Sequence, residues 1–393
     1  MRIAAVRICV MYDCLFPWTV GGAERWYRAL AERLASEGHD VTYVTLLQWE
    51  PGDEPQLPGV QVVGLGGKRR PLYDGDGKRR LGPPLYFGAA TWWWLLRHGR
   101  HVDVVHTASF PFFSMLALAV AWPVGRYRIL CDWHEVWSAD YWREYLGPVG
   151  GRIGWLVQWL CARVPQRSFA FSALHGDRLR ALVPGREVVQ LTGEYAGPLE
   201  PPQPTPAPAT PHVVYAGRYI PEKRVPALVP AIAWARERCP GLRATLLGDG
   251  PERERVIAEV REAGLEQVVS VPGFVSAQQV DETFAACSVV VQPSCREGYG
   301  MVVVESAARG VPVVVARADD NAATELVEPS VNGFIADDVT PERLGQALLD
   351  AIDGGNRLRA STCDWFARNA QRLSLGHSLD LLDDVYGQEA ATR

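Results

Sequence analysis

A proline-rich segment divides the sequence into two parts and sets the first constraint on the fold. Seven of the 14 residues from Pro198 to Pro211 are proline. Because proline fixes φ and has no backbone N–H, this segment cannot form a helix interior or a central strand. It is typical of an extended, semi-rigid connector between folded domains. The segment therefore predicts domains over residues 1–197 and 212–362, joined by a linker over 198–211.

Length and composition agree with two folded domains. The chain has 393 residues, which is more than a single hydrophobic core usually organises. Its hydrophobic fraction of 48% and charged fraction of 22% are those of a folded protein and exclude disorder for the bulk of the chain.

Charge is shared unevenly between the two parts. The formal net charge of −5 argues against general nucleic-acid binding. Residues 1–200 contain 22 Lys and Arg against 19 Asp and Glu, a balance of +3, which leaves −8 for the rest. The first part is therefore the better candidate for an anionic partner.

The first part follows a strand and helix alternation. An apolar run at 8–12 and a glycine-containing loop precede a helical pattern at 23–37, and a second apolar strand follows at 41–47. We expect further short strands at 60–63, 102–106, 129–132 and 168–172. This order predicts an α/β fold with a parallel, doubly wound sheet.

The second part restarts the same plan after the prolines. We expect strands at 212–216, 243–247, 268–271, 289–292 and 311–316, with a helix at 227–238 after the first of them. After Thr340 the pattern is helical to the end. A second doubly wound α/β domain is therefore predicted.

No pattern in the sequence indicates a disulfide framework, a zinc site, secretion or a membrane span. The eight cysteines are dispersed without a C-x-x-C pair, and we expect no metal ligands. The N-terminus lacks the three parts of a signal peptide, and no apolar run reaches the roughly 18 to 20 residues of a spanning helix. The longest run, 110–122, predicts a buried helix. We expect a cytoplasmic protein.

The strongest local pattern lies at 294–305, SCREGYGMVVVE, where a strand passes through a glycine-containing loop into a helix. The unpaired N–H groups at such a helix start suit an anion such as a diphosphate. Gly298 and Gly300 allow close approach of backbone to a ligand. Glu297 and Glu305 can accept hydrogen bonds from hydroxyl groups of a sugar and a ribose.

Three other loops at predicted strand ends carry residues suited to the same ligand. The segment AGRYIPEK places Arg218 and Lys223 after the first strand of the second domain, where two cations would neutralise a leaving diphosphate. A glycine-rich turn begins at Gly248, and the segment PGF ends at Phe274. In a doubly wound fold, ligands bind at the carboxyl ends of the strands.

The strings GRYIPEK, GDGPE, PGFV and EGYGMVVVESAARGVPVV resemble the donor domain of the retaining glycosyltransferases of family 4. The resemblance covers essentially the whole chain. It implies the GT-B architecture, in which two Rossmann-like domains face each other across a cleft. Residues 1–197 would then bind the acceptor and 212–362 the nucleotide-sugar donor, with the helices of 363–393 crossing back to the first domain.

The resemblance also implies roles for individual residues. Arg218 and Lys223 would hold the diphosphate, Glu305 the ribose and Glu297 the transferred sugar, while Phe274 and Val275 would flank the base. Gly21 and Gly22 resemble the loop that faces the donor. The remaining donor-binding residues expected in this way are Gly248, Gly298, Tyr299, Gly300, Met301 and Val302.

The histidines of the first part depart from the family pattern. Family members commonly carry Asp-x-x-His-x-His, and this chain has His106 in DVVHTA without the second histidine. His106 is the nearest match to a catalytic histidine. His134 and Glu135, in the segment DWHE at another strand end, are further acceptor-side candidates. For either histidine, a structural role at a strand terminus is an equal alternative.

The resemblance implies a retaining, metal-independent hexosyltransferase, in which Glu297, His106, Arg218 and Lys223 take part in catalysis. The donor would be a UDP- or GDP-sugar, no cofactor is needed, and a glycan, a lipid-linked precursor or a small-molecule natural product would accept the sugar. A GT-B nucleotide-sugar epimerase and a non-catalytic nucleotide-sugar-binding protein are the alternatives. A dinucleotide-dependent oxidoreductase is disfavoured, since no G-x-G-x-x-G follows the first strand.

Basic and aromatic clusters in the first part suggest a further partner. The basic clusters KRR at 68–70 and 78–80 are followed by three tryptophans at 92–94. Such clusters could rest on an anionic membrane surface or hold a phosphorylated acceptor, so we expect possible peripheral membrane association. The alternative is a solvated loop followed by a buried helix. Tyr141 and the tryptophans at 133, 137 and 142 could stack on a sugar or lie in the core.

Overall fold

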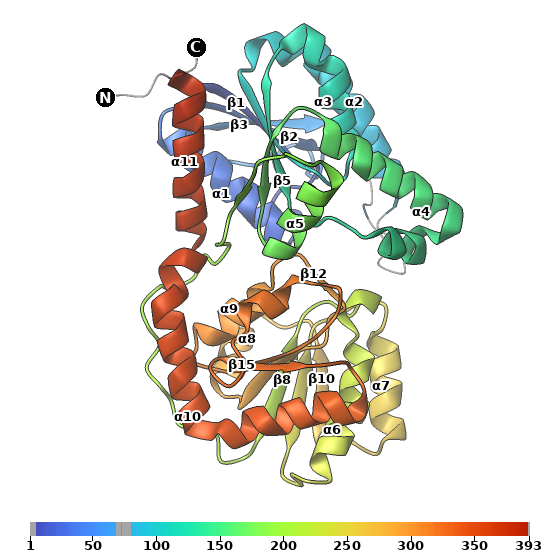
Figure 1. Cartoon of the computed structure of the whole chain (residues 1–393), viewed down its shortest axis with the longest axis vertical. Helices are drawn as coiled ribbons and strands as arrows, with labels where there is room; N and C mark the ends of the chain where they lie inside the picture. Colours follow the sequence, from blue (N-terminus) through green and yellow to red (C-terminus); the bar gives the residue numbers. More distant parts are fainter. Residues whose placement is uncertain (1–4, 68–71, 73–79, 392–393) are drawn as a thin grey trace. The chain divides into compact units, whose positions relative to one another are not determined.

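A computed structural model describes residues 5–67, 72 and 80–391 of the chain (Figure 1). It divides into two compact units, each built on a fully parallel sheet. Of the described residues, unit 1 comprises those up to Glu194 together with Leu375–Ala391, and unit 2 comprises Tyr195–Ser374. The basic clusters of 68–70 and 78–79 lie outside the described residues.

Unit 1 has a seven-stranded sheet in the order β3-β2-β1-β4-β5-β6-β7. Its strands are β1 (Arg7–Met11), β2 (Asp40–Leu46), β3 (Val60–Leu65), β4 (Val104–Ala108), β5 (Arg128–Trp133), β6 (Arg167–Ala170) and β7 (Val188–Gln190). Its helices are α1 (Gly22–Ser36), α2 (Gly82–His98), the 3-10 turn η1 (Gly99–His101), α3 (Phe113–Gly125), α4 (Ala139–Arg163), α5 (Ala173–Leu182) and α11 (Leu375–Ala391). The near-continuous apolar strands are buried, as a parallel sheet covered on both faces requires.

Unit 2 has a six-stranded sheet in the order β10-β9-β8-β11-β13-β15 and a small pair, β12-β14. The strands are β8 (His212–Ala216), β9 (Arg243–Leu247), β10 (Val269–Gly273), β11 (Val289–Gln292), β12 (Arg296–Glu297), β13 (Val313–Ala316), β14 (Asp320–Asn321) and β15 (Gly333–Ala336). The helices are α6 (Leu228–Arg236), α7 (Arg253–Glu262), α8 (Ala277–Ala285), α9 (Met301–Ala307) and α10 (Pro341–Leu373), with 3-10 turns η2 (Pro221–Lys223), η3 (Val225–Ala227) and η4 (Ala322–Leu326). Both strand orders reverse once, which is the doubly wound plan expected from the sequence.

The proline-rich segment is attached to unit 2 instead of lying free between two domains. The guanidinium of Arg359, on α10, is buried and donates to the carbonyl of Thr205 over 2.9 Å. Asn356 of the same helix accepts from the backbone N–H of Ala207 over 2.7 Å. Because these bonds fix the segment along α10, the division of the chain falls at Glu194 and Tyr195, before the prolines.

The apolar run at 110–122 forms α3, but the expectation of a buried helix was only half right. Met115 and Leu118 are buried, whereas Val120 is 67% exposed and Trp122 is 50% exposed. One face of α3 packs against α2 and the other is open to solvent. A run without charged residues does not show which face of a helix is covered.

Candidate functional site

The loops after β8, β9 and β10 form one connected rim at the carboxyl end of the unit 2 sheet. The N–H of Tyr219 donates to the carbonyl of Asp249 over 2.8 Å, and the N–H of Gly248 donates to the carbonyl of Gly273 over 2.9 Å. Gly248 has φ +124°, and a Cβ there would collide with the carbonyl oxygen of Gly217. Glycine is therefore required where the first two loops touch.

Lys223 and Glu297 meet at the point where the strand order of this sheet reverses. Lys223 follows β8 and Glu297 follows β11, and these two strands are neighbours running in parallel. The Nζ of Lys223 lies 2.6 Å from Oε1 of Glu297, with both side chains largely buried. The same oxygen accepts from Nε2 of Gln292 over 2.8 Å. An ammonium group is thus held at the position where doubly wound folds bind their ligands.

Asn321 fixes the strand that carries Glu297. It is 2% exposed and lies on β14, opposite Glu297 on β12. Its amide group donates to the carbonyls of Ser294 and Ala316 over 3.1 and 2.7 Å, and its oxygen accepts from the N–H of Ala323. Sequence reasoning missed Asn321, because β12 and β14 are too short to show a strand pattern.

Gln292 was also missed, although the sequence carried a signal for it. It is a buried polar residue that ends the valine run of β11. A polar side chain in a buried run needs a hydrogen-bond partner, and here the partner is Glu297.

The loop before α9 depends on Gly300, which has φ +112°. A Cβ there would lie 2.6 Å from Cβ of Ala323, so the loop packs directly against η4. Tyr299 is buried, Gly298, Met301 and Val302 are half-buried, and Glu305 is half-buried one turn into the helix.

Two predicted donor-binding residues project into solvent. Phe274, directly after β10, is 86% exposed, and the neighbouring Val275 is half-buried. The side chain of Arg218 is exposed, and its carbonyl accepts from the hydroxyl of Tyr215 over 3.0 Å. An exposed aromatic ring at a strand end is suited to stacking on a base, and an exposed guanidinium to pairing with phosphate.

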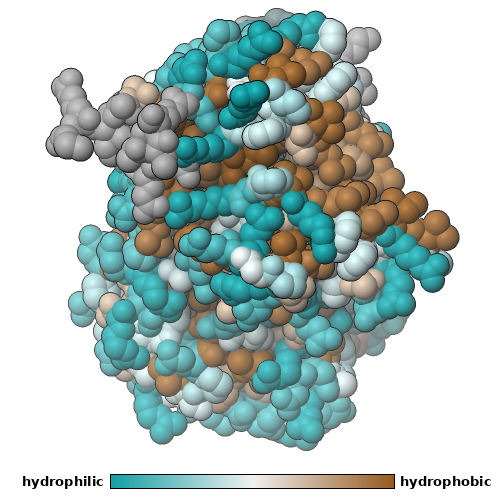
Figure 2. Space-filling model, turned by 45° about the horizontal axis from the view of Figure 1, so that its top comes forward, coloured by the Kyte–Doolittle hydropathy of each residue, from teal (hydrophilic) through white to brown (hydrophobic). Residues whose placement is uncertain are grey.

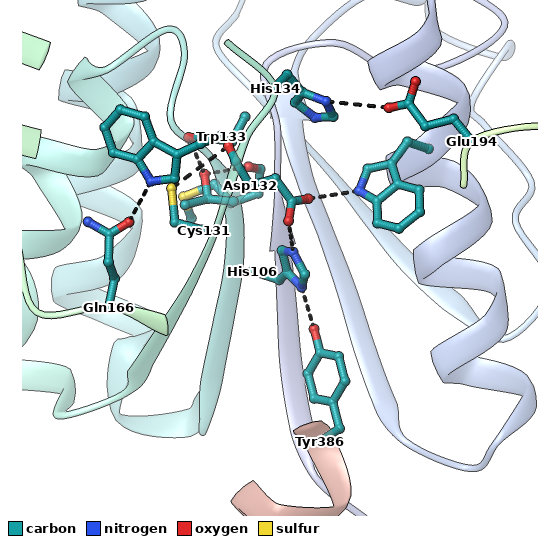
Figure 3. A network of polar contacts seen from close by, with 12 residues as sticks. His106, Cys131, Asp132, Trp133, His134, Gln166, Glu194 and Tyr386 are labelled. Carbon is teal, nitrogen blue, oxygen red and sulfur yellow. Dashed lines mark hydrogen bonds and ion pairs between the residues drawn. The ribbon is translucent and has the colours of Figure 1, made fainter. Parts of the chain in front are cut away.

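In unit 1 the structure corrects the expectation for His106. The imidazole is fully buried on β4, with Nε2 2.9 Å from Oδ1 of Asp132 and Nδ1 2.7 Å from the hydroxyl of Tyr386 on α11 (Figure 3). Asp132 also accepts from Nε1 of Trp26 over 2.7 Å. Because both ring nitrogens are used and no part of the ring reaches solvent, His106 joins α11 to the sheet and is not placed to touch a substrate.

Charges around Asp132 keep it ionised. Burial alone would raise the pKa of Asp132, but His106, His134 and the hydrogen bond from Trp26 outweigh it and lower the pKa. The carboxylate of Asp132 is thus held by two side chains, the ring of His106 and the indole of Trp26.

His134 is the more accessible of the two candidate histidines. It follows β5, its side chain is 24% exposed, and its ring stacks on Phe171 at 4.5 Å between centroids. Nδ1 lies 3.6 Å from Oε1 of Glu194 (Figure 3). Burial lowers the pKa of His134, but Glu194, Asp132 and Glu135 outweigh burial and raise it. Oε2 of Glu135 accepts from Nε1 of Trp137 over 2.6 Å.

The glycines of the first loop lie at the start of α1. Gly21 is the N-cap and Gly22 the first helical residue. A Cβ on Gly21 would collide with the carboxylate of Glu24, which is buried in the first turn, whereas a Cβ on Gly22 would meet open space. Because that carboxylate is the flexible end of a side chain, neither glycine is required by its surroundings.

Most of the candidate stacking residues belong to the core of unit 1. Trp133, Trp142 and Tyr141 are buried, and only Trp137 is half-buried. The first two pack in the same apolar cluster as Phe112.

Metal and membrane-spanning features were searched over the described residues. No group of three or more His, Cys, Asp or Glu side chains in this part of the chain is arranged to hold a metal ion. None of the described helices is both long enough and apolar enough to span a bilayer.

Comparison with known proteins assigns both units to one class. The family described as Glycosyltransferase Family 4 matches residues 20–188, and the family described as Glycosyl transferases group 1 matches residues 200–372. Sucrose-phosphate synthase from Thermosynechococcus elongatus superposes with a TM-score of 0.78 at 19% identity, covering 99% of this chain and 100% of that one. The chain belongs to the family 4 glycosyltransferases and has the GT-B fold.

Other relatives of this family 4 chain support the same assignment. The GDP-mannose-dependent alpha-(1-6)-phosphatidylinositol monomannoside mannosyltransferase of Mycobacterium tuberculosis is 27% identical over 192 residues, which is 46% of this chain and 49% of that protein. The chain thus spans about half the length of the curated relatives it matches. The structure of Anabaena HepE in complex with UDP and glucose superposes with a TM-score of 0.70 at 19% identity, covering 98% and 100% of the two chains.

The two family matches separate the predicted site residues. All predicted donor-binding residues except Gly21 and Gly22 fall within 200–372, and the acceptor-side residues fall within 20–188. In this family 4 chain the donor-side prediction therefore concerns unit 2 and the acceptor-side prediction unit 1.

Proposed function

We propose that the chain is a retaining glycosyltransferase that moves a sugar from a nucleoside diphosphate sugar to an acceptor bound by unit 1. The observation that carries the proposal is the Lys223 and Glu297 pair, 2.6 Å apart, at the reversal point of the unit 2 sheet. An ammonium group and a carboxylate held there can bind the diphosphate and the hydroxyl groups of one donor.

The donor would be bound by the rim of unit 2. Lys223 and the exposed Arg218 would hold the diphosphate, with the N–H groups from Tyr299 to Val302 adding donors. Glu305 would accept from the ribose, Glu297 from the transferred sugar, and Phe274 with Val275 would flank the base. The relatives named above use GDP-mannose in one case and are complexed with UDP and glucose in another, which supports a UDP- or GDP-sugar.

The reaction would break the bond between the anomeric carbon and the diphosphate oxygen, and the electron pair would leave with the phosphate. The acceptor oxygen would bond to the same face of that carbon, and its proton would pass to the departing oxygen. Negative charge grows on the diphosphate in this transition state, so the cations of Arg218 and Lys223 would stabilise it more than the ground state. We propose that they do so without a metal ion.

Unit 1 would contribute the acceptor side through His134 with Glu135. A His134 whose pKa is raised by Glu194 can donate a hydrogen bond to an acceptor or a donor hydroxyl at neutral pH.

The test is incubation of the purified chain with UDP-, GDP-, ADP- and dTDP-sugars, with and without EDTA, followed by 31P and 1H NMR. We expect one donor to release its nucleoside diphosphate in EDTA, and the first sugar product to keep the anomeric configuration of the donor. An inverted product would contradict the retaining mechanism, and loss of activity in EDTA would contradict metal independence. Epimerised donor would favour the epimerase.

A further inference from the structure

Large hydrophobic side chains are exposed almost entirely on one part of unit 1. Among the described residues, ten large hydrophobic side chains are exposed on three helices and one N-cap of unit 1. The other two that are exposed, Val20 and Phe274, lie elsewhere. These ten, which we call the apolar face, are Leu81, Leu85, Trp92 and Trp93 of α2 and its N-cap, Val120 and Trp122 of α3, and Val149, Ile153, Leu156 and Leu160 of α4. Contiguous apolar surface of this kind marks an interaction site.

The exposed side of α4 is a complete helical stripe. Val149, Ile153, Leu156 and Leu160 are spaced by four, three and four residues and are 69%, 58%, 48% and 42% exposed. This spacing places them on one side of the helix, where a core-facing stripe is expected. The core contacts of α4 are instead made by the opposite side, which includes Gly154 and Cys161. The helix is apolar on both sides.

The three helices form one continuous surface. α2 packs closely on α3, since a Cβ on Gly88 would lie 2.6 Å from Cβ of Phe113, and α3 contacts α4. Figure 2 shows hydrophobic residues gathered along the side of the molecule that α2, α3 and α4 occupy in Figure 1.

The charge around the apolar face is mostly positive. Of the three helices that carry this face, only α4 has acidic residues, Asp140 and Glu144, and both precede its kink at Gly147. Residues 80–102, 104–131 and 145–176 contain eight arginines and no Asp or Glu. Asp103, which interrupts the first two stretches, is buried and paired with Arg7. The guanidinium of Arg97 lies over Trp93, and that of Arg163 over Trp159, each 3.5 Å from the ring centroid. Arginine and tryptophan side by side suit the headgroup region of a bilayer.

We propose that the apolar face docks onto an anionic lipid bilayer, with Trp92, Trp93 and Trp122 at the boundary between headgroups and acyl chains. Interfacial helices of peripheral proteins combine apolar residues with Lys or Arg in this way. The charge favours lipid over a second copy of the chain, because a two-fold contact would bring the arginines of one copy against those of the other. The inference goes beyond the proposed transfer reaction and needs no donor.

Sedimentation with lipid vesicles tests the proposal. The probe is a vesicle of phosphatidylglycerol and phosphatidylcholine in equal parts, compared with phosphatidylcholine alone, at low and high salt. The double variant I153E/L156E places two charges on the stripe, and A263E/Q267E adds the same charge at exposed positions of unit 2. Thermal unfolding and gel filtration of each variant show that it is folded and report its oligomeric state.

We expect the wild-type chain to bind the anionic vesicles, with weaker binding at high salt and little binding to phosphatidylcholine. I153E/L156E should weaken binding by about tenfold or more, and the unit 2 control should not. A second double variant, R152Q/R163Q, should weaken binding to anionic vesicles while leaving the apolar stripe intact.

Three results would overturn the proposal. In the first, the wild-type protein stays in solution with both kinds of vesicle. In the second, the I153E/L156E variant is folded and binds vesicles as strongly as wild type. In the third, the wild-type protein is a dimer that binds no vesicles, and I153E/L156E is a monomer. The last result would assign the apolar face to contact between copies of the chain.

Discussion

At the scale of single residues, Lys223 and Glu297 hold each other in place. Each is largely buried, and Gln292 shares the carboxylate oxygen that Lys223 contacts. Removing either charge leaves its partner buried without compensation, so substitution of either mixes a structural effect with a functional one. Arg218 is exposed and gives a cleaner test of the cationic contribution.

We expect R218A to lower kcat by about a hundredfold while changing KM much less, because the guanidinium would act on charge that develops in the transition state. Steady-state kinetics with the donor identified by NMR measure this. R238A, which removes an exposed arginine at the end of α6, is the matched control and should behave as wild type. Equal kcat in R218A and wild type would remove this role from Arg218.

The raised pKa of His134 predicts a pH-dependent effect of Glu194. A histidine whose folded pKa exceeds its unfolded value of about 6.5 binds more protons in the folded state. The protonated His134 therefore contributes its full stabilisation below the unfolded pKa, and this stabilisation is lost as the pH rises through the folded pKa. E194Q removes the carboxylate next to Nδ1 and should lower this pKa.

We expect E194Q to reduce the free energy of unfolding more at pH about 6 than at pH about 9. Urea unfolding at both values, with NMR titration of the histidine ring protons, measures the two effects. E187Q, at an exposed position of the same unit, is the control. An unchanged His134 pKa in E194Q would contradict the assigned cause.

Sequence patterns could place the loops of the predicted donor-binding residues at one sheet edge, but they could not show the surroundings of His106. The loops of Arg218, Lys223 and Glu297 follow strands, so their side chains reach one sheet edge whatever the details of packing. The surroundings of His106 come from residues 26 and 280 positions away, and no local pattern shows that both ring nitrogens are occupied.

At the scale of elements, long apolar strands were predictable and short or surface-dependent features were not. The strands 243–247 and 289–292 agree with β9 and β11. β7 has three residues and β12 and β14 have two each, below the length at which a strand pattern is visible. The helix at 110–122 was expected to be buried because its composition is apolar, yet Val120 and Trp122 on it are exposed.

The attachment of α11 to unit 1 depends on Tyr386. Its hydroxyl lies 2.7 Å from Nδ1 of His106, within hydrogen-bond distance, in a fully buried position. Y386F would leave that nitrogen without a partner, and we expect the free energy of unfolding of unit 1 to fall by about 1–3 kcal/mol. A double-mutant cycle with H106Q, measured by urea unfolding, should show coupling between the two residues. Strict additivity would contradict the bond.

At the scale of the whole molecule, the chain leaves unit 1 at Glu194, builds unit 2 and returns to unit 1 as α11. The returning helix was expected from the family resemblance, although composition could not show where it begins. The positive balance of residues 1–200 has a physical counterpart in the arginines around the apolar face. Composition alone could not reveal that face, because it depends on which side of α2, α3 and α4 is covered.

The central claim is that unit 2 binds a nucleoside diphosphate sugar through Glu305 and its neighbouring loops. The most direct test is thermal unfolding of wild type and E305A with UDP, GDP, ADP and dTDP and their common sugars, with and without EDTA and magnesium. A ligand that binds only the folded chain raises the unfolding temperature. E262A, an exposed glutamate on α7, is the control. We predict that one nucleotide raises the unfolding temperature of wild type and E262A, that EDTA does not change this rise, and that E305A shows no rise. An equal rise in E305A, or no rise of wild type with any nucleotide, would contradict the claim.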